Sequence, residues 1–143
     1  NSLIIMNISV VEMWEDFAQY IINNYADADK IVEVGVGKFH LVSSILQENL
    51  KTTIVLTDIK PSSKKIVQDD ICNPDLKIYK GSSLIYSIRP QPELQPYIID
   101  VAEKVGSDVI IKPFSTEFVS SNKMKLINYR KTTFYKISVG KSI

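Results

Sequence analysis

Apolar residues recur in the first part of the chain at the spacing of one helical face. Between residues 9 and 26 they lie three or four positions apart, which predicts an amphipathic helix. Ser9 and Glu12 have the spacing of a capping box, so this helix is expected to begin at Ser9. Two further helices are expected over residues 39–50 and 92–105, and Gly106 ends the second of them.

Between the helices the pattern changes to short, nearly continuous apolar runs. They occupy residues 30–35, 52–58, 64–70, 82–88 and 107–114. Strands of this kind are buried on both faces, as in a parallel sheet with crossover helices. Residues 123–129 and 132–139 indicate an antiparallel hairpin. The pattern predicts one α/β domain over residues 1–143, with a single doubly wound, mostly parallel Rossmann-like sheet that carries the hairpin at one edge.

Composition narrows the range of functions. The chain has 143 residues and a formal charge of +1, from 17 basic and 16 acidic residues, which gives no electrostatic signal for nucleic acid or for an anionic membrane. No apolar run approaches the roughly 18 residues of a membrane span. The opening "NSLIIM" is much shorter than a signal peptide, and Met6 is a candidate start of translation. Cys72 and His40 are each alone, so we expect a cytoplasmic protein with no metal site.

The stretch "VEVGVGKF" at residues 32–39 joins the first predicted strand to the next helix. In a doubly wound sheet the ligand crevice lies beyond the carboxyl ends of the strands, which places Gly35 and Gly37 at its edge. Gly35 can adopt the backbone conformation of a turn, and Gly37 has no side chain to block a ligand at the helix N-terminus. A tight strand-to-helix corner without a ligand explains a lone glycine pair equally well.

Acidic residues end the next two predicted strands. Asp58 follows Gly37 by 21 residues, where a carboxylate accepts hydrogen bonds from ribose hydroxyls. It would also repel a 2′-phosphate, although Lys60 weakens that argument. Asp70, beside Asp69, ends the third strand, where a carboxylate can accept from the amine of adenine. The alternatives are a strand-ending cap for Asp58 and solvated loop acids for the other two.

These residues resemble the cofactor motifs of the Rossmann-type S-adenosylmethionine-dependent methyltransferases: "VEVGVG", Asp58 and "DDICNP". The resemblance implies a methyltransferase-like fold, S-adenosylmethionine as cofactor, and a role for Glu33 at the methionine end. The stretches "VEVGVGKF", "DDICNPDLKIYKGSSLIYSIRP", "PELQPYI" and "VGSDVIIKP" more closely resemble an archaeal family, uncharacterised protein family 0146. That similarity covers roughly residues 10–139 and implies a fold and a cofactor class rather than a reaction.

Two positions depart from the methyltransferase pattern. The third glycine is replaced by Phe39, which either narrows the pocket or, as we favour, packs the helix onto the sheet. Where amino-methylating relatives carry an Asp or Asn and a Pro-Pro-Tyr-like turn, this chain has "YSIRPQPEL", so Ser87 and Arg89 become the catalytic candidates. A guanidinium favours carboxylate or phosphate, so Arg89 is expected to hold an anionic substrate group or the cofactor's carboxylate. A salt bridge to Glu93 or Asp108 is the alternative.

Other candidates are weaker. Tyr79 and Tyr86 could stack on a base, but alternating strand residues are more often core. His40 could act as a base, yet a lone histidine in a first helical turn is more often structural, and Cys72 has no obvious histidine partner. The leading prediction is a small S-adenosylmethionine-binding protein, a methyltransferase acting on a small-molecule or other substrate. The alternatives are a non-catalytic nucleotide- or partner-binding module and an NAD-linked oxidoreductase, which the missing third glycine disfavours.

Overall fold

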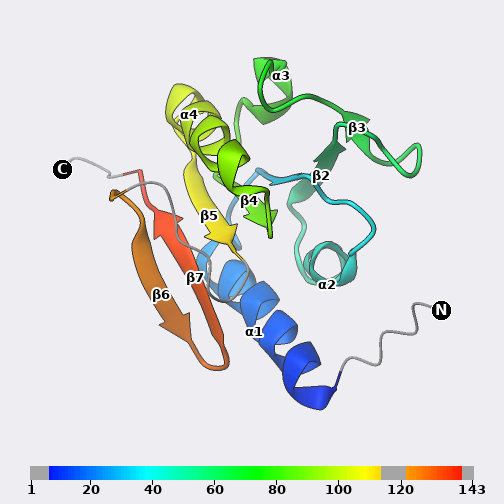
Figure 1. Ribbon diagram of the computed structural model, residues 1–143. Helices are drawn as coiled ribbons and strands as arrows, with labels where there is room; N and C mark the ends of the chain where they lie inside the picture. Colours follow the sequence, from blue (N-terminus) through cyan, green and yellow to red (C-terminus); the bar gives the residue numbers. More distant parts are fainter. Residues whose placement is uncertain (1–6, 114–121, 140–143) are drawn as a thin grey trace.

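The computed structural model describes residues 7–113 and 122–139 (Figure 1). Helix α1 runs over Ile8–Asn24. Its N-cap is Asn7, whose side-chain oxygen accepts from the Val10 N–H at 2.9 Å. The capping box predicted at Ser9 and Glu12 is therefore wrong: Asn is as good a cap as Ser, and it lies two residues earlier. Met6 and the residues before it lie outside the described residues.

The remaining elements follow the predicted alternation. The strands are β1 (Lys30–Val34), β2 (Thr53–Asp58), β3 (Val67–Gln68), β4 (Leu84–Ile88) and β5 (Asp108–Lys112), followed by β6 (Lys125–Tyr129) and β7 (Thr132–Ile137). The helices after α1 are α2 (Leu41–Asn49), α3 (Leu76–Tyr79) and α4 (Gln95–Val105), the last preceded by a 3₁₀ turn at Pro92–Leu94. Gly106 ends α4 with φ 71°, a left-handed conformation that glycine adopts without steric cost.

The described strands form one seven-stranded sheet in the order β3-β2-β1-β4-β5-β7-β6. Strands β1 to β5 pair in parallel, and β7 pairs antiparallel with both β5 and β6. The predicted mostly parallel, doubly wound sheet with a hairpin at one edge is therefore confirmed. Figure 1 shows the hairpin of β6 and β7, in orange and red, at the edge far from β3.

A hydrophobic core lies on each face of the sheet. On one face α1 and α2 pack against alternate strand residues around Phe17, Tyr86 and Phe134. On the other face α4 and the α3 region pack around Ile85, Ile98 and Ile111. Because successive residues of one strand enter opposite cores, β1 and β4 are buried over almost their whole length.

Two elements differ from the sequence expectation. The third strand spans two exposed residues, Val67 and Gln68, instead of residues 64–70, and α3 was not predicted. Asp75 caps α3 by accepting from the Lys77 N–H. Phe114, the last residue of the predicted fifth strand, lies outside the described residues. Within the described ranges, no helix has the length and apolarity needed to cross a membrane.

Candidate functional site

The strand order reverses between β1 and β4. From β1 the chain adds β2 and β3 on one side, and β4 then begins the other half of the sheet. In open α/β sheets such a reversal opens a crevice beyond the carboxyl ends of the strands. The structure has a cleft of about 260 Å³ at this position, and we call it the switch-point cleft. Its lining comes from the end of β1, the following loop and the end of β4: Glu33, Gly35, Val36, Gly37, Lys38, Phe39, Ile88 and Arg89.

The glycine corner follows β1 and forms one wall of the cleft. Gly35 and Gly37 have φ values of 69° and 56°, which side-chain-bearing residues rarely adopt. A Cβ on either glycine would meet no atom within 4 Å, so the backbone conformation, not crowding within the protein, calls for glycine. Between them, buried Val36 donates its N–H to the Thr57 carbonyl at 3.0 Å, which ties the loop to β2.

Asp58 ends β2 and is in direct contact with this corner. Its Oδ2 accepts from the Gly37 N–H at 2.8 Å, and its Oδ1 accepts from the Lys60 N–H at 2.9 Å. The sequence spacing that suggested one shared site for Gly37 and Asp58 is matched by this contact. His40 closes the same turn, with its Nε2 3.0 Å from the Gly37 carbonyl oxygen.

Glu33 lies at the bottom of the cleft and is only 1% exposed. Its Oε1 accepts from the Tyr86 hydroxyl at 2.7 Å, whereas Oε2 has no hydrogen-bond partner among the described residues. Burial raises the pKa of Glu33 to about 8, although the hydrogen bond from Tyr86 acts in the opposite direction. The carboxyl is therefore mostly protonated at neutral pH. An unpartnered buried oxygen of this kind marks a place where a ligand donor fits.

The mouth of the cleft is aromatic and cationic. The Phe39 ring packs on Trp14 of α1, with ring centroids 4.9 Å apart, and it lines the cleft as one wall. The guanidinium carbon of Arg89 lies 5.5 Å from the centroid of each of these two rings. Phe39 therefore packs against α1 and the core on that face of the sheet, and it also lines the cleft, so both roles considered for it are seen.

Arg89 follows β4 with φ 51°, a left-handed conformation that costs a residue with a Cβ roughly 1–2 kcal/mol. Its N–H donates to the Lys112 carbonyl at 2.6 Å, so pairing with β5 fixes this backbone. Asp108 begins β5 at the opposite edge of the sheet, where it accepts from Tyr25 and from Val139. The salt bridge from Arg89 to Asp108 that was one alternative is thus ruled out by strand register.

The second catalytic candidate, Ser87, is buried within β4. Its hydroxyl donates to the Val34 carbonyl at 2.8 Å, a contact that joins β4 to β1. Its catalytic role stays a prediction, and this location favours Arg89 as the residue that meets a ligand. Tyr86 and Tyr79 are fully buried, in agreement with the core role favoured for them.

Two acidic residues follow β3 at the same sheet edge. Asp69 accepts from the Asp75 N–H and, at 2.6 Å, from the Tyr79 hydroxyl, so it stabilises the loop that leads into α3. Asp70 is exposed and accepts from the Cys72 N–H at 2.9 Å. Asp70 therefore remains the better candidate for a ligand contact, outside the cleft and beyond Asp58.

Sequence reasoning missed two features of this region. Ile59 follows Asp58 directly and is 56% exposed, an unusual position for a large apolar side chain. Its signal in the sequence is an isoleucine immediately after a strand-ending aspartate. Trp14 belongs by its spacing to the apolar face of the first predicted helix, but its side chain also contacts Arg89, which lines the cleft. Among residues 7–113 and 122–139, no cluster of three or more His, Cys, Asp or Glu side chains could hold a metal ion.

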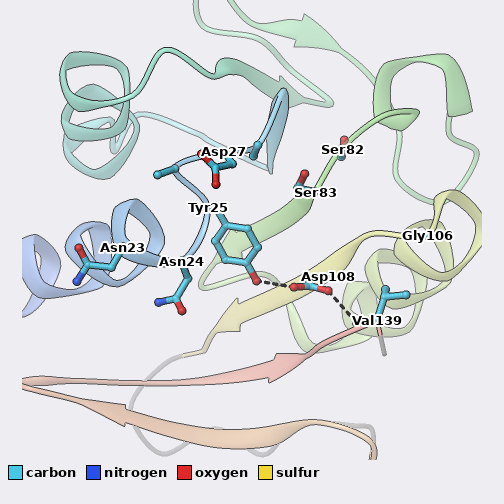
Figure 2. Close-up of a pocket in the computed structure, with 11 residues that line it drawn as sticks. Asn23, Asn24, Tyr25, Asp27, Ser82, Ser83, Gly106, Asp108 and Val139 are labelled. Atoms are coloured by element: carbon cyan, nitrogen blue, oxygen red, sulfur yellow. Dashed lines mark hydrogen bonds between the residues drawn. The ribbon is translucent and has the colours of Figure 1, made fainter. Parts of the chain in front are cut away.

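A larger cavity, of about 600 Å³, lies at the amino ends of the parallel strands, opposite the switch-point cleft (Figure 2). It is bounded by the end of α1 and by the segments that precede β1, β4 and β5, among them Tyr25, Asp27, Ser83 and Asp108. The Tyr25 hydroxyl donates to Asp108 at 2.7 Å. Figure 2 shows this contact among the residues that line the cavity. Ligands of open α/β sheets bind at the carboxyl edge, so the smaller switch-point cleft remains the candidate site.

Comparison with solved structures defines the class of fold. An RNA methyltransferase from Salinibacter ruber, in complex with S-adenosyl-L-homocysteine, matches with a TM-score of 0.60 at 14% identity, over 89% of this chain and 92% of that one. A candidate S-adenosyl-L-methionine-dependent methyltransferase from Methanococcus maripaludis gives a TM-score of 0.66 at 14% identity, over 95% and 89%. The chain has the fold of the S-adenosylmethionine-dependent methyltransferases.

Sequence relatives then define the family. The sequence model of the uncharacterised protein family UPF0146 matches residues 14–139. The UPF0146 protein of Methanothermobacter thermautotrophicus is 48% identical over 124 residues, 86% of this chain and 93% of that protein. The UPF0146 protein of Archaeoglobus fulgidus is 40% identical, over 84% and 91%. This chain belongs to family UPF0146, as its motifs suggested.

Proposed function

We propose that this protein binds S-adenosylmethionine at the switch-point cleft and acts as a small methyltransferase. The observation that supports this most directly is Glu33, a buried carboxyl that lines the cleft and whose Oε2 has no partner among the described residues. An ammonium group placed there would supply the missing donor and would favour the ionised carboxylate. The residues therefore fit an adenosyl ligand that carries an amino-acid end.

The other predicted contacts extend this site along the carboxyl edge. Each oxygen of Asp58 accepts one backbone N–H and keeps acceptor capacity, so ribose hydroxyls can be added without loss of the loop contacts. Exposed Ile59 offers an apolar surface to a base, with Asp70 one strand further along. A cleft of about 260 Å³ is smaller than the roughly 300–1,000 Å³ typical of ligand sites, so it accommodates the amino-acid end while the nucleoside lies on this rim.

Bound S-adenosylmethionine would supply an activated methyl group, and the protein would contribute alignment of an acceptor. The residues at the end of β4 favour a second candidate function, a binding module that has lost methyl transfer. Ser87 is buried and donates to a backbone carbonyl, and Arg89 stands where amino-methylating relatives position their acceptor.

We also propose a cytoplasmic location, supported by the single cysteine, exposed Cys72.

Thermal unfolding with S-adenosylhomocysteine tests cofactor binding. A ligand at a hundred times its dissociation constant adds about 2.7 kcal/mol to the free energy of unfolding. For a domain of this size the midpoint should rise by on the order of 5–15 °C. Gly37→Leu places a branched side chain at the cleft wall and should abolish the rise, whereas NAD should produce none in the wild-type protein.

Gly81→Leu is the matched control. Gly81 also has positive φ, 83°, and a Cβ there also meets nothing within 4 Å, but it lies before β4, away from the cleft. The control should lose stability to a similar degree and keep the ligand-induced rise. If S-adenosylhomocysteine leaves the wild-type midpoint unchanged, the proposed cofactor is wrong. If it binds, transfer of a labelled methyl group to components of a cell extract separates an enzyme from a binding module.

A further inference from the structure

The switch-point cleft is lined by one acidic side chain and two basic side chains. Glu33 supplies a carboxyl at its buried end, and Arg89 supplies a guanidinium at its exposed mouth. Lys38, also exposed, lines the wall between the glycine corner and Phe39. A ligand that enters this cleft therefore meets an acceptor at one end and permanent donors at the other.

The guanidinium of Arg89 is held in place by its surroundings. Its carbon lies 5.5 Å from the ring centroids of both Trp14 and Phe39, which come from α1 and from the loop after β1. The Arg89 N–H donates to the Lys112 carbonyl, so the backbone at this point is fixed as well. The guanidinium lies over these rings, and its planar fork of N–H donors matches the two oxygens of a carboxylate.

We propose that Arg89 binds the carboxylate of the ligand's own α-amino-acid end, while Glu33 receives its ammonium. The cleft then recognises a zwitterion, and Arg89 is the residue that selects ligands with a carboxylate. This inference rests on the proposed adenosyl ligand and names the part of it that the cleft distinguishes.

Charge and size favour this ligand group over an anion on a second substrate. A sulfonium near Arg89 would be repelled unless a negative group lay between them, and the amino-acid carboxylate belongs to the same molecule. The cleft of about 260 Å³ already has to hold the amino-acid end beside Glu33, which leaves little room there for a separate anionic group.

Three probes and the intact protein test the proposal by calorimetry. S-adenosylhomocysteine carries both ammonium and carboxylate, S-adenosyl-3-thiopropylamine lacks only the carboxylate, and 5′-methylthioadenosine lacks the whole amino-acid end. In the wild-type protein, loss of the carboxylate should weaken binding by about 10- to 100-fold. In Arg89→Gln the difference in affinity between S-adenosylhomocysteine and S-adenosyl-3-thiopropylamine should shrink to less than about threefold. The affinities of the two probes that lack a carboxylate should be nearly unchanged. Arg89→Lys keeps the charge without the fork and should fall between them.

Arg130→Gln is the matched control. Arg130 also has φ 51° and stacks on a tyrosine, Tyr129, but it lies in the turn between β6 and β7. It should leave all three affinities and their ratio unchanged. The unfolding midpoint of each variant shows whether the fold is retained.

The proposal is overturned if Arg89→Gln and Arg89→Lys preserve the carboxylate preference. It is also overturned if Lys38→Gln removes that preference instead. If Arg89→Gln leaves all three probes unaffected but weakens binding of an anionic acceptor, the guanidinium serves a second substrate. Failure of the wild-type protein to bind any of the three probes would contradict the proposed adenosyl ligand itself, whereas binding of all three with equal affinity contradicts only the role of Arg89.

Discussion

Glu33 is the residue whose chemistry depends most on the folded state. In an unfolded chain its carboxyl titrates at the ordinary value, whereas burial beside Tyr86 raises the pKa to about 8 in the folded protein. Between about pH 4.5 and 8 the folded form therefore holds a proton that the unfolded form has lost. Its stabilising contribution is complete at acidic pH and disappears as the pH rises through 8.

Glu33→Gln should remove this dependence. The amide oxygen can still accept from the Tyr86 hydroxyl, but the side chain no longer titrates. As the pH rises from 5 to 8, the wild-type protein should lose stability relative to the variant by roughly 1.4 kcal/mol per pH unit at most, and by a few kcal/mol in total. Chemical denaturation at several pH values measures the difference, and parallel curves for the two proteins would contradict a raised pKa.

The sequence predicted which of the candidate residues lie together but not their protonation or conformation. Spacing along the strands was enough to bring Glu33, Gly35 and Gly37 to one cleft and to set Asp58 beside Gly37. The protonation of Glu33 could not be predicted, because it depends on a hydroxyl 53 residues away and on the removal of water by two packed layers. The position of the Arg89 guanidinium likewise depends on a ring from α1.

Tyr25 joins the end of helix α1 to the start of strand β5. The hydroxyl of Tyr25, the cap residue, donates to Asp108 at the start of β5, and Asp108 also accepts from the Val139 N–H after β7. Tyr25→Phe should lower the free energy of unfolding by about 1–2 kcal/mol, because a hydrogen bond to a charged group is lost while the ring stays packed.

Urea denaturation measures this change, with Tyr97→Phe as the control. Tyr97 lies on α4 and is 46% exposed, so removal of its hydroxyl should change stability by less than about 0.5 kcal/mol. Equal effects of the two substitutions would mean that the contact between Tyr25 and Asp108 contributes nothing.

Helices and strands with strong periodicity were predicted well, and elements set by single side chains were not. The buried runs of β1, β4 and β5 leave little choice of structure because both faces are apolar. The start of α1 depends on whether Asn7 or Ser9 supplies the cap, and both are good cap residues. Helix α3, four residues long, is stabilised by the Asp75 cap and by Tyr79 bonded to Asp69, contacts that periodicity cannot indicate.

Two cavities of the described part of the molecule lie at opposite ends of the parallel strands, and ligand binding should affect only one of them. Hydrogen exchange with and without S-adenosylhomocysteine should show slower exchange at residues 35–40 and 58–60, beside the switch-point cleft. Residues 23–28, beside the cavity in Figure 2, should be unaffected. Protection confined to residues 23–28 would move the ligand to the amino edge and contradict the proposed site.

The sequence predicts a parallel sheet and a hairpin, but it does not predict the full order of the strands. Alternating strands and helices predict a parallel sheet with crossover helices, and the last two strands predict a hairpin. That β7 rather than β6 lies beside β5 depends on long-range pairing, such as that of Ile111 with Tyr135. This pairing leaves β6 as the outermost described strand.

The hydrogen bonds between Asp58 and the loop have a kinetic consequence. Because the carboxylate already positions Gly37 and still has lone pairs to offer, the proposed nucleoside would find its contact surface assembled, and no segment would have to be rebuilt on binding. Among related complexes the association rate varies much less than the affinity, so differences among ligands would lie in their dissociation rates. Selectivity among ligands at this site would therefore depend on how slowly each one dissociates, not on how fast it associates.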